Sequence, residues 1–168
     1  MNNERELTAE RLRGLLSYDQ ATGVFTWREK PSPRIHAGAV AGTVMSHGYR
    51  HIKIGDRYYK AHRLAWLYVV GSWPQAHIDH RNCHRDDNRF DNLREASRAI
   101  NSQNRRNASR GKRSCNLLGA YLDRNSGRWN SKLRVNGRVR FLGCFATAEE
   151  AHEAYVAAKR IHHPGCTI

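Results

Sequence analysis

The segment from Ile78 to Asn104, IDHRNCHRDDNRFDNLREASRAINSQN, constrains the fold of this chain more than any other part of the sequence. Its pattern predicts a strand near His77–His80, a long polar loop, a short strand around Leu93–Glu95 and a helix from about Ser97 onward. We therefore expect an α+β fold in which strand, loop, strand and helix follow one another directly.

Two neighbouring residues of this segment, Asp79 and His80, have the chemistry of a hydrolytic site. Histidine has an ordinary pKa near 6.5 and can act as a general base at neutral pH. A carboxylate and an Asn amide oxygen are hard ligands, which suit Mg²⁺ or Mn²⁺ better than zinc. Neighbouring strand residues point to opposite faces, so either the strand bends or metal and water lie on different sides of the scissile phosphate. The second arrangement fits the chemistry, although Asp79 could instead merely cap a turn.

The net charge of +14 and the pI near 10.3 predict a polyanionic partner. Between Arg98 and Arg140 there are twelve Lys or Arg residues and a single acid, Asp123. An anionic membrane is the competing partner, but no basic amphipathic helix supports it, and the longest apolar run is too short to span a bilayer. We expect a cytoplasmic protein of a bacterial or phage-infected cell, whose four scattered cysteines are free thiols.

A basic segment, RRNASRGKRSC, follows the opening motif and is expected to link two domains. It contains five basic residues and no acid, so it is either an ordinary flexible linker or a linker that also touches DNA phosphates. We favour the second interpretation. The expected phosphate contacts are Arg105, Arg106, Arg110, Lys112 and Arg113.

From Gly119 to the end, the sequence predicts three strands and a helix. Thr147-Ala-Glu-Glu150 is a capping box for that helix. A two-residue Asn136-Gly137 turn would pair Val135 with Arg138 and mix apolar and basic side chains on each face. A three-residue loop would pair Val135 with Val139 and keep the faces pure, so we expect the three-residue loop.

The motif residues Asp79-His80, Asn92-Leu93-Arg94 and Asn101-x-x-Asn104 resemble those of HNH endonucleases of the phage and intron homing type. The resemblance spans roughly residues 40–107. It implies a ββα-metal core, also called the His-Me finger, with one divalent ion, Mg²⁺ or Mn²⁺. By this resemblance His80 is the general base, Asp79 and Asn101 bind the metal, and Asn92 pins the loop that orients the base. The last residue of the signature is Asn101 and not His, a variant seen in phage and intron members.

The last fifty or so residues resemble the DNA-binding domain of the APETALA and ethylene-response-factor type. The resemblance rests on motifs such as Arg128-Trp129, Leu142-Gly143-x-Phe145 and Ala154-Tyr155. It implies a three-stranded antiparallel sheet, packed on one helix, that reads DNA in the major groove. The residues placed at that interface are Arg128, Lys132, Arg134 and Arg140.

These observations predict three spans: a nuclease domain over 1–104 with an N-terminal helix and strand region, a basic linker over 105–116, and a DNA-binding domain over 117–168. The expected activity is metal-dependent hydrolysis of phosphodiester bonds in double-stranded DNA, leaving 5′-phosphate and 3′-hydroxyl ends by the family resemblance. A monomer would nick one strand, and a homodimer could cut both. The alternative is a sequence-specific DNA-binding regulator with a vestigial nuclease core.

Overall fold

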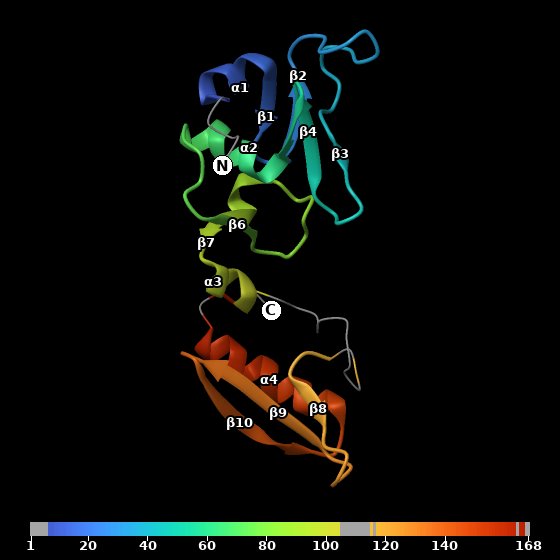
Figure 1. Ribbon diagram of the computed structural model, residues 1–168, viewed down its shortest axis with the longest axis vertical. Helices are drawn as coiled ribbons and strands as arrows, with labels where there is room; N and C mark the ends of the chain where they lie inside the picture. Colours follow the sequence, from blue (N-terminus) through green and yellow to red (C-terminus); the bar gives the residue numbers. More distant parts are fainter. Residues whose placement is uncertain (1–6, 105–114, 116, 164, 167–168) are drawn as a thin grey trace. The chain divides into compact units, whose positions relative to one another are not determined.

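The computed structural model of the chain describes residues 7–104, 115, 117–163 and 165–166. It divides into two compact units, Met1–Ser97 and Arg98–Ile168 (Figure 1). Each unit combines helices with small antiparallel sheets, so the predicted α+β class is confirmed. Among the described residues, no helix has the length and apolar character needed to cross a membrane. The predicted spans 1–104, 105–116 and 117–168 stay a prediction.

The first unit begins with a capped helix and a hairpin. Thr8 caps α1 (Ala9–Leu15), and its side-chain oxygen accepts a hydrogen bond from the Arg11 backbone at 3.2 Å. The chain then continues directly into β1 (Leu16–Asp19), which pairs with β2 (Val24–Trp27).

A second sheet follows in the order β3-β4-β5, built from β3 (Thr43–Val44), β4 (Arg50–Ile54) and β5 (Arg57–Lys60). Helix α2 (Ala61–Val70) starts immediately after β5 and ends at Gly71. Its apolar face is buried in the core that it shares with α1 and both sheets. The largest fully buried apolar side chains of this core are Leu12, Leu16, Phe25, Ile52, Leu64 and Leu67.

The last part of the first unit is a two-stranded sheet of β6 (His77–His80) and β7 (Leu93–Ala96). The long loop between them ends in a 3-10 turn, η2 (Phe90–Asn92). Ile78 and Leu93 anchor the two strands in the core of the first unit. The strand–loop–strand order predicted from the sequence is therefore confirmed.

The second unit contains α3 (Arg98–Gln103) and a three-stranded sheet of β8 (Ala120–Leu122), β9 (Trp129–Val135) and β10 (Arg138–Phe145). Helix α4 (Ala148–His162) lies along one face of this sheet. The predicted capping box is confirmed, because the Thr147 and Glu150 side chains each bond to the other's backbone. Ala148 and Ala151 bring α4 close to the sheet, where Trp129 and Phe145 pack against them.

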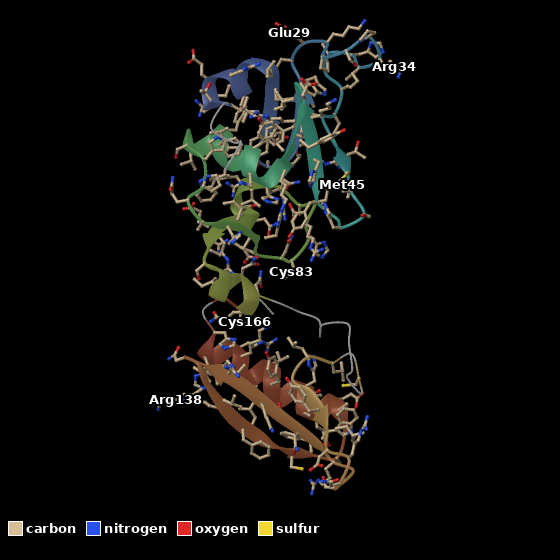
Figure 2. All side chains as sticks on the ribbon, in the orientation of Figure 1. Glu29, Arg34, Met45, Cys83, Arg138 and Cys166 are labelled. Atoms are coloured by element: carbon tan, nitrogen blue, oxygen red, sulfur yellow. The ribbon has the colours of Figure 1, made fainter. Side chains whose placement is uncertain are left out.

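The predicted three-residue loop between β9 and β10 is wrong. Val135 pairs with Arg138 across a two-residue Asn136-Gly137 turn, at the strand end where Figure 2 labels Arg138. Asn136 has a φ of 50° and Gly137 a φ of 80°, the two left-handed conformations that an Asn-Gly hairpin turn adopts readily. The backbone preference of Asn-Gly therefore decides the turn length, even though the resulting register mixes apolar and basic side chains on each face of the sheet. A register shift between Phe141 and Gly143 then returns Phe145 to the helix-covered face, opposite Trp129.

Candidate active site

Strand β6 presents Asp79 and His80 from two adjacent buried positions, at 6% and 4% exposure. In the register of the sheet, Asp79 lies opposite Arg94 and His80 opposite Leu93. The two side chains reach different partners, as adjacent residues of a regular strand do.

The His80 ring is surrounded by other rings and by one buried amide. His62 of α2 lies edge-to-face against it at 5.0 Å between ring centroids, and the Tyr49 ring lies at 5.8 Å. Burial is the main cause that lowers the pKa of His80, so its imidazole is neutral at pH 7. Burial and the neighbouring His80 also lower the pKa of His62 to about 2. A neutral imidazole at this position can accept a proton.

Asn88 selects the nitrogen of His80 that carries the proton. The Asn88 Nδ2 donates to the Asp86 carbonyl at 3.0 Å, so its Oδ1 faces the His80 Nε2 at 3.4 Å. An amide oxygen only accepts, so Nε2 is the protonated nitrogen of the neutral ring. The lone pair that takes a proton is therefore on Nδ1.

Asp79 forms a buried ion pair with Arg94. The Arg94 Nε and NH2 atoms donate to Asp79 Oδ2 at 3.0 and 2.9 Å, and the two side chains are only 15% and 7% exposed. The structure thus shows Asp79 as a buried carboxylate that is paired with the Arg94 guanidinium, and not as a turn cap. Such an ionised, oriented carboxylate fits the donor chemistry of a hard divalent ion.

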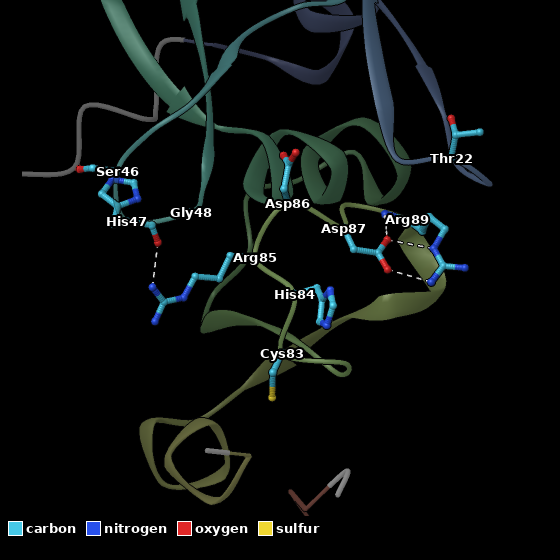
Figure 3. Close-up of a pocket in the computed structure, with 10 residues that line it drawn as sticks. All are labelled: Thr22, Ser46, His47, Gly48, Cys83, His84, Arg85, Asp86, Asp87 and Arg89. Carbon is cyan, nitrogen blue, oxygen red and sulfur yellow. Dashed lines mark hydrogen bonds and ion pairs between the residues drawn. The ribbon is translucent and has the colours of Figure 1, made fainter. Parts of the chain in front are cut away.

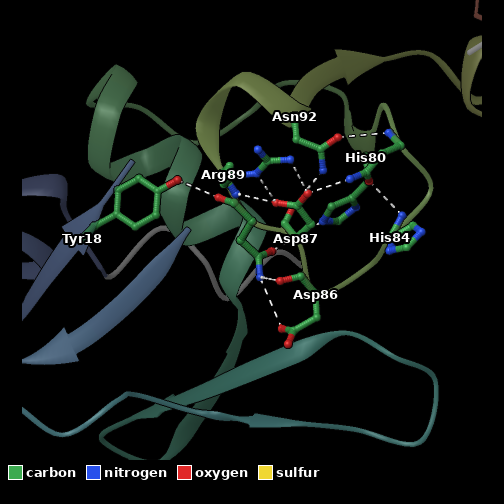
Figure 4. A network of polar contacts seen from close by, with 9 residues as sticks. Tyr18, His80, His84, Asp86, Asp87, Arg89 and Asn92 are labelled. Carbon is green, nitrogen blue, oxygen red and sulfur yellow. Dashed lines mark hydrogen bonds and ion pairs between the residues drawn. The ribbon is translucent and has the colours of Figure 1, made fainter. Parts of the chain in front are cut away.

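The Asn92 side chain bonds to the start and to the middle of the loop between β6 and β7 (Figure 4). Its Oδ1 accepts from the Asn82 backbone at 3.0 Å, and its Nδ2 donates to the Asp87 carbonyl at 2.8 Å. The Arg81 backbone also donates to the Asn92 carbonyl at 2.9 Å. Both side-chain polar atoms of Asn92 are therefore engaged with the loop backbone, which is the geometry of a positioning residue.

Asp87 holds the middle of the same loop. It accepts from Asn82 Nδ2 at 2.6 Å and from Arg89 Nε and NH2 at 2.9 and 2.8 Å. The hydrogen bond from Arg89 is the largest of the effects that lower the pKa of Asp87 to about 2. Arg89 thus has a carboxylate partner within the loop.

The β1–β2 hairpin supports this loop, a role that the sequence interpretation missed. The Tyr18 hydroxyl donates to the Asn88 carbonyl at 2.6 Å, and the Phe90 backbone donates to the Gln20 carbonyl at 3.2 Å. Gly23 lies so close that a β-carbon there would collide with the backbone of Asn88 and Arg89. Gly23, which closes the Asp19–Gly23 turn, was the signal in the sequence for a close backbone approach. The sequence could not show which segment approaches, because Asn88 and Arg89 lie more than 60 residues further along the chain.

Gly23→Ala is expected to lower the free energy of unfolding more than Gly55→Ala does. Both glycines have positive φ, 75° and 59°, so each alanine costs about 1–2 kcal/mol of backbone strain. Gly55 faces open space, whereas Gly23 abuts the loop, so its variant should lose roughly a further 1–3 kcal/mol. Urea unfolding of both variants measures the difference, and equal losses would contradict the proposed support of the loop by the hairpin.

Residues 59–103 match a family model described as HNH endonuclease. The matched span contains Asp79, His80, Asn92 and Asn101, and it points to an endonuclease, a phosphodiester hydrolase that acts on nucleic acid. Searches of curated proteins and of solved structures found no match.

The remaining HNH residue, Asn101, lies on α3 in the second unit and is exposed. Its pairing with Asp79 at one metal ion stays a prediction. Among the residues described, no group of three or more His, Cys, Asp or Glu side chains is arranged to hold a metal. The predicted ligand set consists of one carboxylate, Asp79, and one amide, Asn101, so it is not a group of that composition.

The family match does not extend to the C-terminal sheet, so its likeness to the APETALA type stays a prediction. The observed register changes the expected basic face. Residues directly opposite in an antiparallel pair share a face, so Val139 lies beside Arg134 and Phe141 beside Lys132. Val139 and Phe141 are 57% and 61% exposed. The face that α4 leaves uncovered therefore mixes basic and apolar side chains, and is not purely basic as expected.

The other two predicted contacts of this sheet are placed differently. Arg140 lies opposite buried Leu133, on the side that α4 covers, and its NH1 is 3.4 Å from His162 Nε2. Arg128 donates to the Cys144 carbonyl at 3.2 Å. The predicted linker contacts lie outside the described residues: Arg105, Arg106, Arg110, Lys112 and Arg113.

Proposed function

We propose that the chain is a metal-dependent endonuclease of the HNH homing type that hydrolyses double-stranded DNA. The observation that carries the proposal is His80, a buried neutral imidazole next to the ionised Asp79, within the residues that match the HNH endonuclease model. The net charge of +14 supports a nucleic acid as substrate.

The residues of the site divide the work of hydrolysis. His80 Nδ1 takes the proton of a water molecule as the water oxygen forms a bond to phosphorus and the phosphorus–oxygen bond to the leaving group breaks. Asn88 and Asn92 keep the imidazole and its loop in place. Asp79 and Asn101 would hold Mg²⁺ or Mn²⁺. When bound, such an ion stabilises the negative charge that develops on the leaving oxygen.

Nicking of supercoiled plasmid tests this function. The full chain with Mg²⁺ or Mn²⁺ is expected to convert supercoiled DNA to open circles, and EDTA is expected to stop the reaction. A monomer that cuts one strand gives open circles first, while a homodimer that cuts both gives linear DNA directly. No cleavage with any divalent ion would refute the enzyme and leave the DNA-binding regulator as the function of the chain.

The C-terminal sheet is proposed to hold the DNA with its uncovered, mixed face. Lys132 and Arg134 supply charge for phosphates, and the exposed Phe141, opposite Lys132, supplies an apolar surface for base edges such as the thymine methyl group. Val139, two residues earlier on the same face of β10, is exposed as well and extends this apolar surface.

Phe141→Ser is expected to weaken duplex binding by about five- to thirtyfold, because burying part of a Phe side chain contributes about 1–2 kcal/mol. The matched control is Ile161→Ser, which removes another exposed apolar side chain, 78% exposed, from α4. Fluorescence anisotropy with a labelled duplex measures both. Equal affinities of the two variants would rule out the sheet face as the apolar contact.

A further inference from the structure

The Tyr49 ring, next to the candidate base, carries two cationic side chains. The Lys60 Nζ lies over it at 5.2 Å from the centroid, and the Arg85 guanidinium carbon lies at 5.1 Å. The same ring lies 5.8 Å from that of His80. Three different segments supply these residues: the turn before β4, the end of β5 and the loop after β6. The fold, and not sequence proximity, brings the two positive charges to one ring beside the base.

Neither cation has a carboxylate partner in the part of the chain that the structure describes. The ion pairs there use other arginines, Arg50, Arg89 and Arg94. Arg85 instead donates to the His47 carbonyl, at 2.7 Å, an uncharged acceptor that fixes the guanidinium without neutralising it (Figure 3). The aromatic face stabilises each cation only modestly. Two unneutralised charges on one ring repel each other and attract an anion.

The positive charge of Lys60 also acts on the neighbouring His51. His51 lies opposite Lys60 in the β4–β5 register, and its ring is 5.1 Å from that of His47. Burial is the largest cause that lowers the pKa of His51, and the charges of His47 and Lys60 lower it further. The surroundings of Tyr49 therefore disfavour an additional proton.

Of the two cations, Arg85 lines a pocket of about 750 Å³ (Figure 3). His47, Gly48 and Arg85 line it, together with other residues of the loop that holds His80. The acids of its wall, Asp86 and Asp87, are paired with arginines. A polyanion that enters the pocket would thus meet Arg85 without meeting an unpaired carboxylate of its wall.

We propose that Lys60 and Arg85, held on Tyr49, form a subsite for a backbone phosphate of the nucleic acid, next to the phosphate that is cleaved. The subsite rests on the proposed nuclease function and names a substrate contact outside the base and the metal ligands. It orients the strand before hydrolysis. Its contribution is made in binding and does not need the metal ion.

The test is duplex binding by the full chain in EDTA, measured by fluorescence anisotropy over a range of KCl concentrations. Lys60→Gln and Arg85→Gln are each expected to lower the affinity severalfold and to reduce the slope of log K against log salt by about 1, the loss of one phosphate contact. The matched control is Lys53→Gln, in the same hairpin, because the Lys53 ammonium lies over the Tyr58 ring at 6.0 Å. Lys53→Gln removes one positive charge and one cation–ring contact, as Lys60→Gln does, but at a position outside the proposed subsite.

Charge-preserving variants separate a phosphate contact from a structural role. Lys60→Arg and Arg85→Lys should keep the salt slope of the unmodified chain, and thermal unfolding should show all variants folded. If Lys60→Gln and Arg85→Gln bind as Lys53→Gln does, the subsite is overturned, even if the chain nicks plasmid. If the chain nicks no plasmid but the slopes fall as expected, the nuclease fails, and Lys60 and Arg85 remain as a phosphate contact of a chain that only binds DNA.

Discussion

Replacing His80 with alanine is expected to lower the rate of plasmid nicking by about 10²–10⁴-fold, the usual contribution of a general base. The reason is the geometry around the ring: burial keeps the imidazole neutral, and Asn88 leaves the lone pair on Nδ1. Initial rates with saturating Mg²⁺ measure the loss. Duplex binding in EDTA should change little, since neutral His80 contributes no charge to phosphate contacts.

His84→Ala is the matched control for this variant. His84 belongs to the same loop, but its side chain is exposed and its backbone makes the hydrogen bond to Asn82. It should nick at nearly the rate of the unmodified chain. Nicking by His80→Ala at that same rate would exclude His80 as the base and point to another proton acceptor.

Asp79→Ala is expected to lower the free energy of unfolding by about 3 kcal/mol, in addition to abolishing metal-dependent nicking. The variant removes the carboxylate that accepts two hydrogen bonds from Arg94 at a site where the two side chains are only 15% and 7% exposed, and losing one partner of a buried ion pair is costly. Urea unfolding measures the stability, and calorimetric titration with Mn²⁺ measures the loss of the metal ligand.

A second ion pair provides the control for stability. Arg50 also donates from two nitrogens to a carboxylate, one to each oxygen of Asp86 at 2.9 Å, but the Arg50 and Asp86 side chains are 23% and 38% exposed. Asp86→Ala should therefore cost less than about 1 kcal/mol. Adding Arg94→Ala to Asp79→Ala should recover part of the lost stability, because it removes the buried guanidinium that has lost its carboxylate. A double variant that loses the sum of both single losses would mean that the pair is not coupled.

Local features of the fold could be predicted because their causes lie within a few residues. Thr8 and Thr147 cap helices through atoms three residues away, and Gly71 ends α2. The prediction for the β9–β10 turn was wrong, because it rested on the separation of apolar and basic faces over two whole strands. The local left-handed preference of Asn136 and Gly137 decides the turn, and the register shift between Phe141 and Gly143 has no visible signal in the sequence.

The sequence by itself determined the chemistry of the candidate site, since Asp79, His80 and Asn92 carry the expected groups and lie within the residues that the family model matches. Only the tertiary structure decided the state of those groups. Burial beside His62 and Tyr49 keeps the candidate base His80 neutral, and Arg94 gives Asp79 its counter-ion. These effects depend on desolvation and on contacts between segments far apart in the chain. Residue spacing determines neither of them, because both arise only when the chain has folded.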